Sequence, residues 1–391
     1  MFRSFLLLAI ALLATPSLAA KPDLKATAEK LVGEVANVQE GQTVWISGNV
    51  TDAELASEIA HATRKRGAVA YVELDRTGMA KRYFAEVPAK FDAAAAKAAL
   101  KRVPLEDVLI SLSRSDDPTE TEGVDPARLA ARAESFKAIV DARMKKKVVI
   151  IDVGNGMFPT ASTAKALGLS LGDLDKMFWA GINTDYKKLA ARGAALKAAI
   201  APGKELVVKN KAGTDIKLRL KPLMLSDGVI SADDQKAGGA AVMTWLPAGE
   251  AYGLVEPASA EGKIVADVPY HGRWIKGVTF TVKAGKLSEI APAKPSKEFD
   301  AWKAVYDAAP AGKEAFSIVD FGINEDVKPP KGKLVPAFVP DGSVTLLFGG
   351  DLWAGGTNNT QWGEALFLSD ATVTVDGKVL VDNGALKLEA K

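Results

Sequence analysis

TVWISGNVTDAELASEIAHATRKRGAVAYVEL, residues 43–74, has the pattern of a strand, a helix and a second strand. The first apolar run is followed by Gly48, which predicts a turn into a helix that Thr51 or Asp52 can cap. The helix is expected to end before Gly67, where the second apolar run begins. Two strands joined by a helix in this order predict a βαβ unit with parallel strands.

The same alternation continues on the C-terminal side of this unit. Strands are expected at 107–112 and 148–152, with a helix at 126–144 between them. The second strand is apolar without interruption up to Asp152, which is typical of a sheet covered on both faces. The sequence therefore predicts an N-terminal α/β domain with a mostly parallel sheet over residues 21–202.

The pattern changes near residue 203. From there to residue 391, alternating apolar and polar residues are interrupted by glycine turns, which predicts antiparallel hairpins. One helix is expected at 298–308. The C-terminal domain is thus predicted to be β-rich, of α+β class.

The N-terminus predicts export. Arg3 precedes an apolar run at 5–14 and small residues at 17–20, so residues 1–20 are predicted to be a cleavable signal peptide. We expect a periplasmic or secreted protein with no membrane anchor after cleavage. Lys and Arg total 50 against 48 Asp and Glu, a balance that favours neither nucleic acid nor an anionic membrane as partner. The chain has no cysteine, so its stability must come from core burial.

Short motifs after residue 150 share one pattern. They are MFPTA (157–161), LGDLDKMFW (171–179), NTDYKKL (183–189), GTDI (213–216) and LPAGEAY (246–252). The series resembles the aminopeptidase T family of metallo-aminopeptidases, which includes thermophilic leucyl aminopeptidases, and LPAGEAY resembles its Pro-x-Gly-Glu motif. The tail, FGIN (321–324), GGTN (355–358) and TVTVDG (372–377), resembles the branch shared with dihydroxypyridine dioxygenases.

This resemblance implies a peptidase, a hydrolase that acts on peptide N-termini and assembles as a homodimer. The β-rich domain would carry two divalent ions, which polarise the scissile carbonyl and activate water. The family supplies their ligands as the Pro-x-Gly-Glu glutamate, a second acid, a histidine and a final His-x-Asp.

Most of these ligands are replaced here. Glu250 matches the first glutamate, the catalytic and metal-binding position, and Asp320 matches the second acid. Thr345 occupies the histidine position, and Gly363 and Ala365 occupy the final His-x-Asp. Because imidazoles make a site prefer zinc, their loss argues against a zinc pair and makes the metal site degenerate.

A carboxylate site remains open as an alternative. Glu364 lies between the two replaced positions, and with Glu250 and Asp320 it could hold a single divalent ion of unknown identity. The two histidines, His61 and His271, are better interpreted as a solvated helix residue and a loop residue. Neither matches a ligand position of the family.

Aromatic residues near these positions are candidates for substrate binding. They are Tyr252, beside Glu250, and Trp353 and Trp362, in a glycine-rich stretch where they either line a pocket or pack at a dimer contact.

Three hypotheses therefore remain. The first is a divergent periplasmic metal-dependent aminopeptidase. The second is a noncatalytic descendant that binds a peptide or small ligand. The third is a homodimeric structural or partner protein whose cleft is closed by a tryptophan.

Overall fold

The computed structural model describes residues 22–200 and 204–388 of the chain. The predicted signal peptide, residues 1–20, and the predicted domain boundary near residue 203 lie outside the described residues. Within the described ranges, no helix is both long and apolar enough to cross a membrane.

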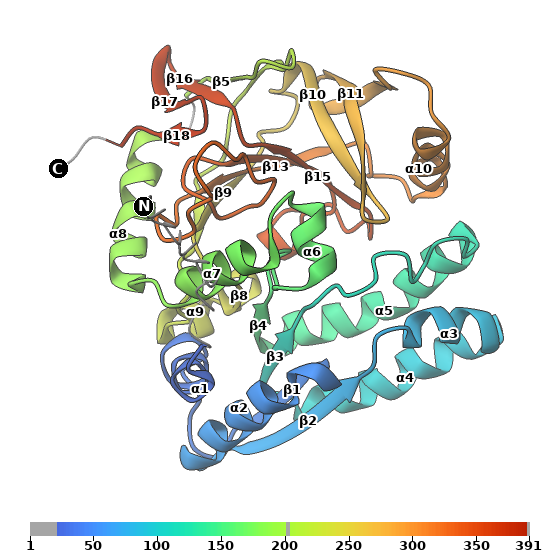
Figure 1. Ribbon diagram of the computed structural model, residues 1–391, viewed down its shortest axis with the longest axis vertical. Helices are drawn as coiled ribbons and strands as arrows, with labels where there is room; N and C mark the ends of the chain where they lie inside the picture. The colour runs from blue at the N-terminus through green and yellow to red at the C-terminus, as the bar shows by residue number, and fades with distance from the viewer. Residues whose placement is uncertain (1–21, 201–203, 389–391) are drawn as a thin grey trace, which may run out of the picture.

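The N-terminal part is built on a parallel sheet (Figure 1). Its strands lie in the order β2-β1-β3-β4-β8, and all neighbouring pairs are parallel. They are β1 (Thr43–Asn49), β2 (Val69–Asp75), β3 (Val108–Leu112), β4 (Val149–Val153) and β8 (Met243–Leu246). The predicted α/β class is confirmed.

Helices alternate with these strands as the sequence predicts. They are α1 (Leu24–Lys30), α2 (Ala53–Lys65), α3 (Met79–Glu86), α4 (Asp92–Arg102), α5 (Pro126–Lys146), α6 (Ala161–Ala166), α7 (Leu171–Ile182) and α8 (Tyr186–Ala199). Short turns of other helix types are η1 (Leu31–Val35), η2 (Val50–Asp52), η3 (Ala89–Phe91) and η4 (Val103–Leu105). The turn after β1 differs in one detail: Asn49 caps it by accepting from the Thr51 amide, and Asp52 makes no cap hydrogen bond.

The C-terminal part contains two antiparallel sheets, which confirms the predicted β-rich class. The larger has the order β12-β11-β10-β6-β5-β16-β17-β18, formed by β5 (Leu206–Lys209), β6 (Asp215–Leu218), β10 (Glu261–Tyr270), β11 (Arg273–Lys283), β12 (Lys286–Ala291), β16 (Thr372–Val375), β17 (Lys378–Asp382) and β18 (Ala385–Leu386). The smaller, which we call the site sheet, has the order β15-β14-β13-β9-β7, formed by β7 (Met224–Ser226), β9 (Glu250–Leu254), β13 (Phe316–Gly322), β14 (Val344–Gly349) and β15 (Gly363–Leu368).

The remaining elements connect these sheets. They are α9 (Ala232–Ala237), η5 (Gly239–Val242), α10 (Lys297–Ala308) and η6 (Leu352–Ala354). Strand β8 comes from the segment assigned to the second domain, yet it pairs with β4 at the edge of the parallel sheet. The chain then passes through the cis bond Leu246–Pro247 directly into β9 of the site sheet. One hydrophobic core, with buried residues from both parts, extends through the molecule.

Candidate functional site

Two neighbouring strands of the site sheet bring together Glu250 and Asp320, the two acids that match family ligand positions. Strands β9 and β13 pair antiparallel, with Asp320 opposite Tyr252 and Gly322 opposite Glu250. Residues two apart on a strand share a face, so Glu250, Tyr252 and Asp320 lie on one face of the sheet, which we call the acid face. The predicted association of Glu250 with Asp320 follows from this register.

The two carboxylates are deeply buried, with exposed fractions of 5% for Glu250 and 6% for Asp320. The side-chain amide of Asn155 donates to Glu250 Oε1 at 2.9 Å and to the Pro247 carbonyl oxygen at 3.0 Å. Asp320 Oδ1 has no hydrogen-bond partner among the described residues. No Lys or Arg forms an ion pair with either acid in the described chain.

Burial without a cation favours the protonated acids. It raises the pKa of Glu250 to about 7; the Asn155 hydrogen bond opposes this change, and the charge of Asp152 adds to it. Burial also raises the pKa of Asp320 well above its usual range, and the neighbouring Glu250 charge raises it further. The two carboxyls therefore retain protons in a pH range where solvated carboxyls are ionised.

The replaced ligand positions also lie on the acid face. Thr345 is opposite Asp320, and on the next strand Ala365 and Gly363 are opposite Leu347 and Gly349. Thr345 Oγ1 is buried and lacks a hydrogen-bond partner in the described part of the chain. The register thus places all five family ligand positions on one face, although three of them have lost the ligand side chain.

Glu364 lies on the opposite face. It pairs with Phe348, whose side chain points away from Thr345 because the two are an odd number of residues apart. Glu364 Oε2 accepts from the Trp302 indole N–H at 3.1 Å. Burial raises the pKa of Glu364 to about 7, although the hydrogen bond from Trp302 acts to lower it. The structure therefore does not bring Glu364 to the acid pair with which the sequence grouped it.

The residues present do not fit a two-metal centre. Among residues 22–200 and 204–388, no group of three or more His, Cys, Asp or Glu side chains is arranged to hold an ion. His61 is exposed on α2, and His271 lies at the turn between β10 and β11, with its Nδ1 3.1 Å from the Pro118 carbonyl oxygen. Neither histidine replaces a lost ligand.

Aromatic rings cover part of the acid face. The Trp353 ring packs at 5.5 Å from Tyr252 and at 5.2 Å from Trp245, measured between ring centroids. Trp362 instead packs edge-on against Tyr306 of α10, at 5.7 Å, and its indole N–H is buried. Trp353 therefore contacts the site through Tyr252, whereas Trp362 belongs to the packing around α10.

A polar cavity of about 320 Å³, which we call the site cavity, lies over β7, β8 and the Tyr252 position of β9, and neither Glu250 nor Asp320 lines it. Tyr252 lines it, as do Ser226, which is opposite Glu250 on β7, and Thr244 of β8. The Ser226 and Thr244 hydroxyls lie 3.2 Å apart and are almost fully buried. The remaining lining includes charges of both signs and apolar groups: Lys197, Met224, Leu225, Asp227, Val229, Ile230, Asp234, Ala240, Ala241 and Met243.

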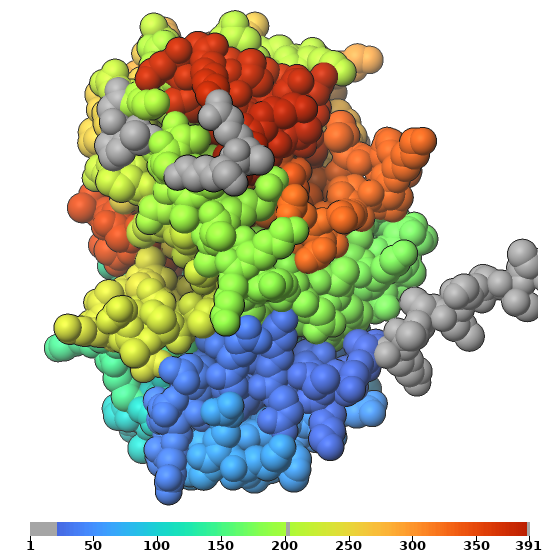
Figure 2. Space-filling model, turned by 90° about the vertical axis from the view of Figure 1, so that its left-hand side faces the viewer, coloured from blue at the N-terminus to red at the C-terminus, as the bar shows by residue number. Residues whose placement is uncertain are grey.

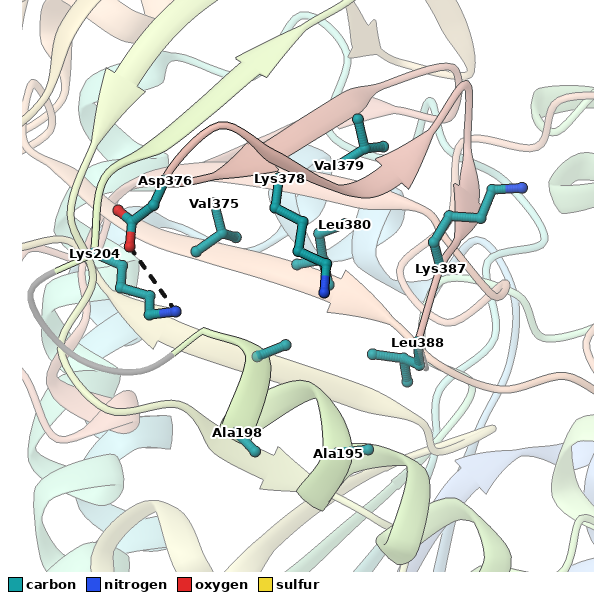
Figure 3. A pocket seen from close by; sticks show the side chains of 11 residues that line it. Ala195, Ala198, Lys204, Val375, Asp376, Lys378, Val379, Leu380, Lys387 and Leu388 are labelled. Atoms are coloured by element: carbon teal, nitrogen blue, oxygen red, sulfur yellow. Dashed lines mark ion pairs between the residues drawn. The ribbon is translucent and has the colours of Figure 1, made fainter. Parts of the chain in front are cut away.

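Other cavities lie on different elements. One of about 390 Å³ lies between α8 and the β16–β18 strands. Lys204 Nζ lies 3.9 Å from Asp376 Oδ2 at its edge, the ion pair marked in Figure 3. None of the predicted site residues lines it. A cavity of about 240 Å³ beside α5 is lined by Trp353 and Trp362, so these two tryptophans share a pocket that does not include the acid pair.

The comparison with known families agrees with this arrangement. Residues 20–302 match the thermophilic metalloprotease (M29) family. The chain belongs to the M29 family. It is thus a metallopeptidase-like protein, and divalent metal dependence is a property of the family it belongs to. The predicted resemblance to metallo-aminopeptidases is confirmed.

Two solved structures share the fold of this M29 member. Wild-type AmpT from Thermus thermophilus is 17% identical, with a TM-score of 0.68 over 93% of this chain and 98% of AmpT. The 2,5-dihydroxypyridine dioxygenase from Pseudomonas putida KT2440 is 16% identical, with a TM-score of 0.53 over 94% of this chain and 97% of the dioxygenase. No curated protein matches the sequence. The predicted likeness to both branches is therefore confirmed at the level of the fold.

Two residues of the site were missed by the sequence analysis. Asp152 is the penultimate residue of strand β4, and Asn155 follows the strand in a turn with φ of 45°. Asp152 accepts from the Ser113 hydroxyl at 2.5 Å, and Asn155 reaches Glu250. The available signal was their place after the carboxyl end of a parallel strand, where α/β proteins usually bind ligands.

Proposed function

We propose that this M29-family protein is exported and noncatalytic, and that it binds a short peptide or an amino acid in the site cavity. The observation that carries the proposal is the buried pair of Glu250 and Asp320, which keeps two family ligands but has no third ligand within the described residues. Two buried carboxyls that retain protons are suited to hydrogen bonding and poorly suited to binding a cation pair.

The lining of the site cavity supports a zwitterionic ligand. Asp227 can pair with an ammonium group, and Lys197 can pair with a carboxylate. The Tyr252 hydroxyl makes no hydrogen bond within the described chain, although the residue is only 3% exposed. Buried hydroxyls normally have partners, so this group is available to a ligand.

Binding is expected to be measurable by isothermal titration with a series of dipeptides and tripeptides. Tyr252→Phe should weaken binding by about 3- to 10-fold, the cost of one lost hydrogen bond. N-acetylation of the ligand should weaken it further, because the amide no longer carries the charge that pairs with Asp227. Tyr71→Phe, at an exposed tyrosine of β2, is the matched control and should leave binding unchanged. Equal affinity for free and acetylated peptides would contradict the assignment of Asp227.

Catalysis is tested separately, on protein purified without chelator. We expect elemental analysis to find no stoichiometric metal, and aminoacyl chromogenic substrates to show no turnover in zinc, cobalt or manganese above that of Glu250→Gln. Stoichiometric metal together with turnover that Glu250→Gln abolishes would instead establish a divergent aminopeptidase. Absence of both turnover and ligand binding would favour a structural or partner protein.

A further inference from the structure

Strand β2 is an unprotected edge of the parallel sheet. It is the last strand on its side, and among the described elements only β1 pairs with it. Figure 1 shows β2 at the lower end of the molecule, near α2 and α4, and Figure 2 shows the same N-terminal segments at that end. The pairing of β2 with β1 runs in register from Val69 to Asp75 without a bulge. Exposed edges are often protected by a bulge, a proline or charged side chains; β2 has no bulge and no proline, and its charged residues are Glu73 and Asp75 near its C-terminal end.

The backbone of β2 offers a regular set of outward groups. The Val69 amide donates to the Gln42 carbonyl at 2.8 Å, which directs the odd-numbered residues of the strand toward β1. Ala70, Val72 and Leu74 therefore direct their N–H and C=O groups away from the sheet. Arg64 donates to the Ala70 carbonyl at 3.4 Å, and this is the one contact to these outward groups in the described chain.

Apolar side chains are exposed along the first part of this edge. Val69, Tyr71 and Val72 are 49%, 50% and 42% exposed. Tyr71 stacks on Trp45 of β1 with 5.0 Å between ring centroids, which extends the apolar surface across two strands. A flat edge with exposed apolar side chains is suited to pair with another strand.

The charges at the two ends of β2 are opposite. Arg64 lies beside Ala70 at the start of the strand, and Asp75 ends it. Neither residue forms an ion pair within the described residues. A strand that is basic at one end and acidic at the other complements an antiparallel copy of itself.

We propose that β2 pairs antiparallel with β2 of a second copy of this chain, about a two-fold axis at Val72. In this register Val72 is opposite Val72, and Ala70 is opposite Leu74 of the second copy. All the outward N–H and C=O groups then meet partners, and the two parallel sheets join into one. The contact is isologous, so it closes at a dimer.

The two-fold axis also brings the opposite charges together. Because Ala70 is opposite Leu74 of the second copy, Arg64 approaches Asp75 of that copy at each end of the interface. In the same register Tyr71 is opposite Glu73 of the second copy. This interface assigns a surface to the homodimer that the family resemblance implies, and it does not depend on the proposed ligand binding.

The sharpest test is Val72→Pro, measured by analytical ultracentrifugation over a concentration series. Proline removes the outward N–H of residue 72 without removing any bond to β1, and edge strands tolerate proline at such positions. Two hydrogen bonds are lost per dimer, so the dimer Kd should rise by about 10- to 100-fold. Val72→Thr keeps the N–H and is the matched control, with a dimer Kd close to that of the natural chain.

A second measurement distinguishes loss of the dimer from misfolding of the Val72→Pro variant. The chain has no cysteine, so Val72→Cys should form a single disulfide between two copies under mild oxidation. Glu289→Cys, on the edge strand β12 of the larger sheet, should not. Arg64→Asp should weaken the dimer, and Arg64→Asp with Asp75→Arg should restore it. A monomer at every concentration, a dimer that Val72→Pro leaves intact, or a β2 edge occupied by a different protein would overturn the proposal.

Discussion

Restoring the three lost ligands, as Thr345→His, Gly363→His and Ala365→Asp together, is expected to raise the affinity for zinc by at least about 100-fold, because each restored group is a direct ligand. The side chains at these positions share the acid face with Glu250 and Asp320. A Cβ added at Gly363 meets no atom within 4 Å, so a side chain has room there. Isothermal titration with zinc, followed by a peptidase assay, measures the outcome.

Two controls define this result. Adding Glu250→Gln to the triple variant should remove most of the gained affinity, because the glutamate would be the central ligand. The same two histidines placed at exposed positions of α4 that face different ways, Ala93 and Ala95, should give only weak binding. If the triple variant binds zinc no better than the natural chain, the register no longer holds the geometry of a metal centre, and simple loss of ligands does not explain the site.

The second large effect is a fall in folding stability as the pH rises from about 4.5 to about 7. The folded pKa of Glu250 is raised from an ordinary 4.5 to about 7, so the folded state binds more protons than the unfolded state in this window. The stabilisation is complete below the lower pH and is lost as the pH passes the folded pKa. The shift corresponds to a contribution on the order of 3 kcal/mol, and Asp320 and Glu364 act in the same direction.

Urea denaturation of chelator-treated protein at several pH values measures this slope. Glu250→Gln should flatten it, because glutamine is neutral throughout and can still accept from Asn155. Glu54→Gln, at an exposed glutamate of α2, should leave the slope unchanged. A stability that rises with pH over this window would show that the acid pair is ionised in the folded protein, as it would be around a bound cation.

Local patterns predicted most elements because their signals are short in range. The apolar run at residues 148–152 predicted strand β4, and the proline at residue 126 marked the start of α5. Asn49, not Thr51 or Asp52, caps the turn after β1, because the chain inserts η2 before α2 begins. Such details depend on backbone angles that composition does not specify.

The site was predicted in part for a similar reason. The resemblance gave Glu250 and Asp320 and the three replaced positions, and the strand register places all five on one face. Glu364 was grouped with them because it is close in sequence, but a shift of one residue along a strand reverses the face. Asn155 was missed because its contact with Glu250 joins residues far apart in the chain.

The return of β8 to the parallel sheet affects how the protein can be divided. A cut at residue 203 would remove the strand that covers β4, and a cut after β8 would leave the larger antiparallel sheet without β5 and β6, which precede it. No single break in the polypeptide yields two pieces with complete sheets. A fragment of either half would therefore lack a strand of its sheet, and Glu250 of the acid pair begins β9 shortly after β8, the strand that links the two halves.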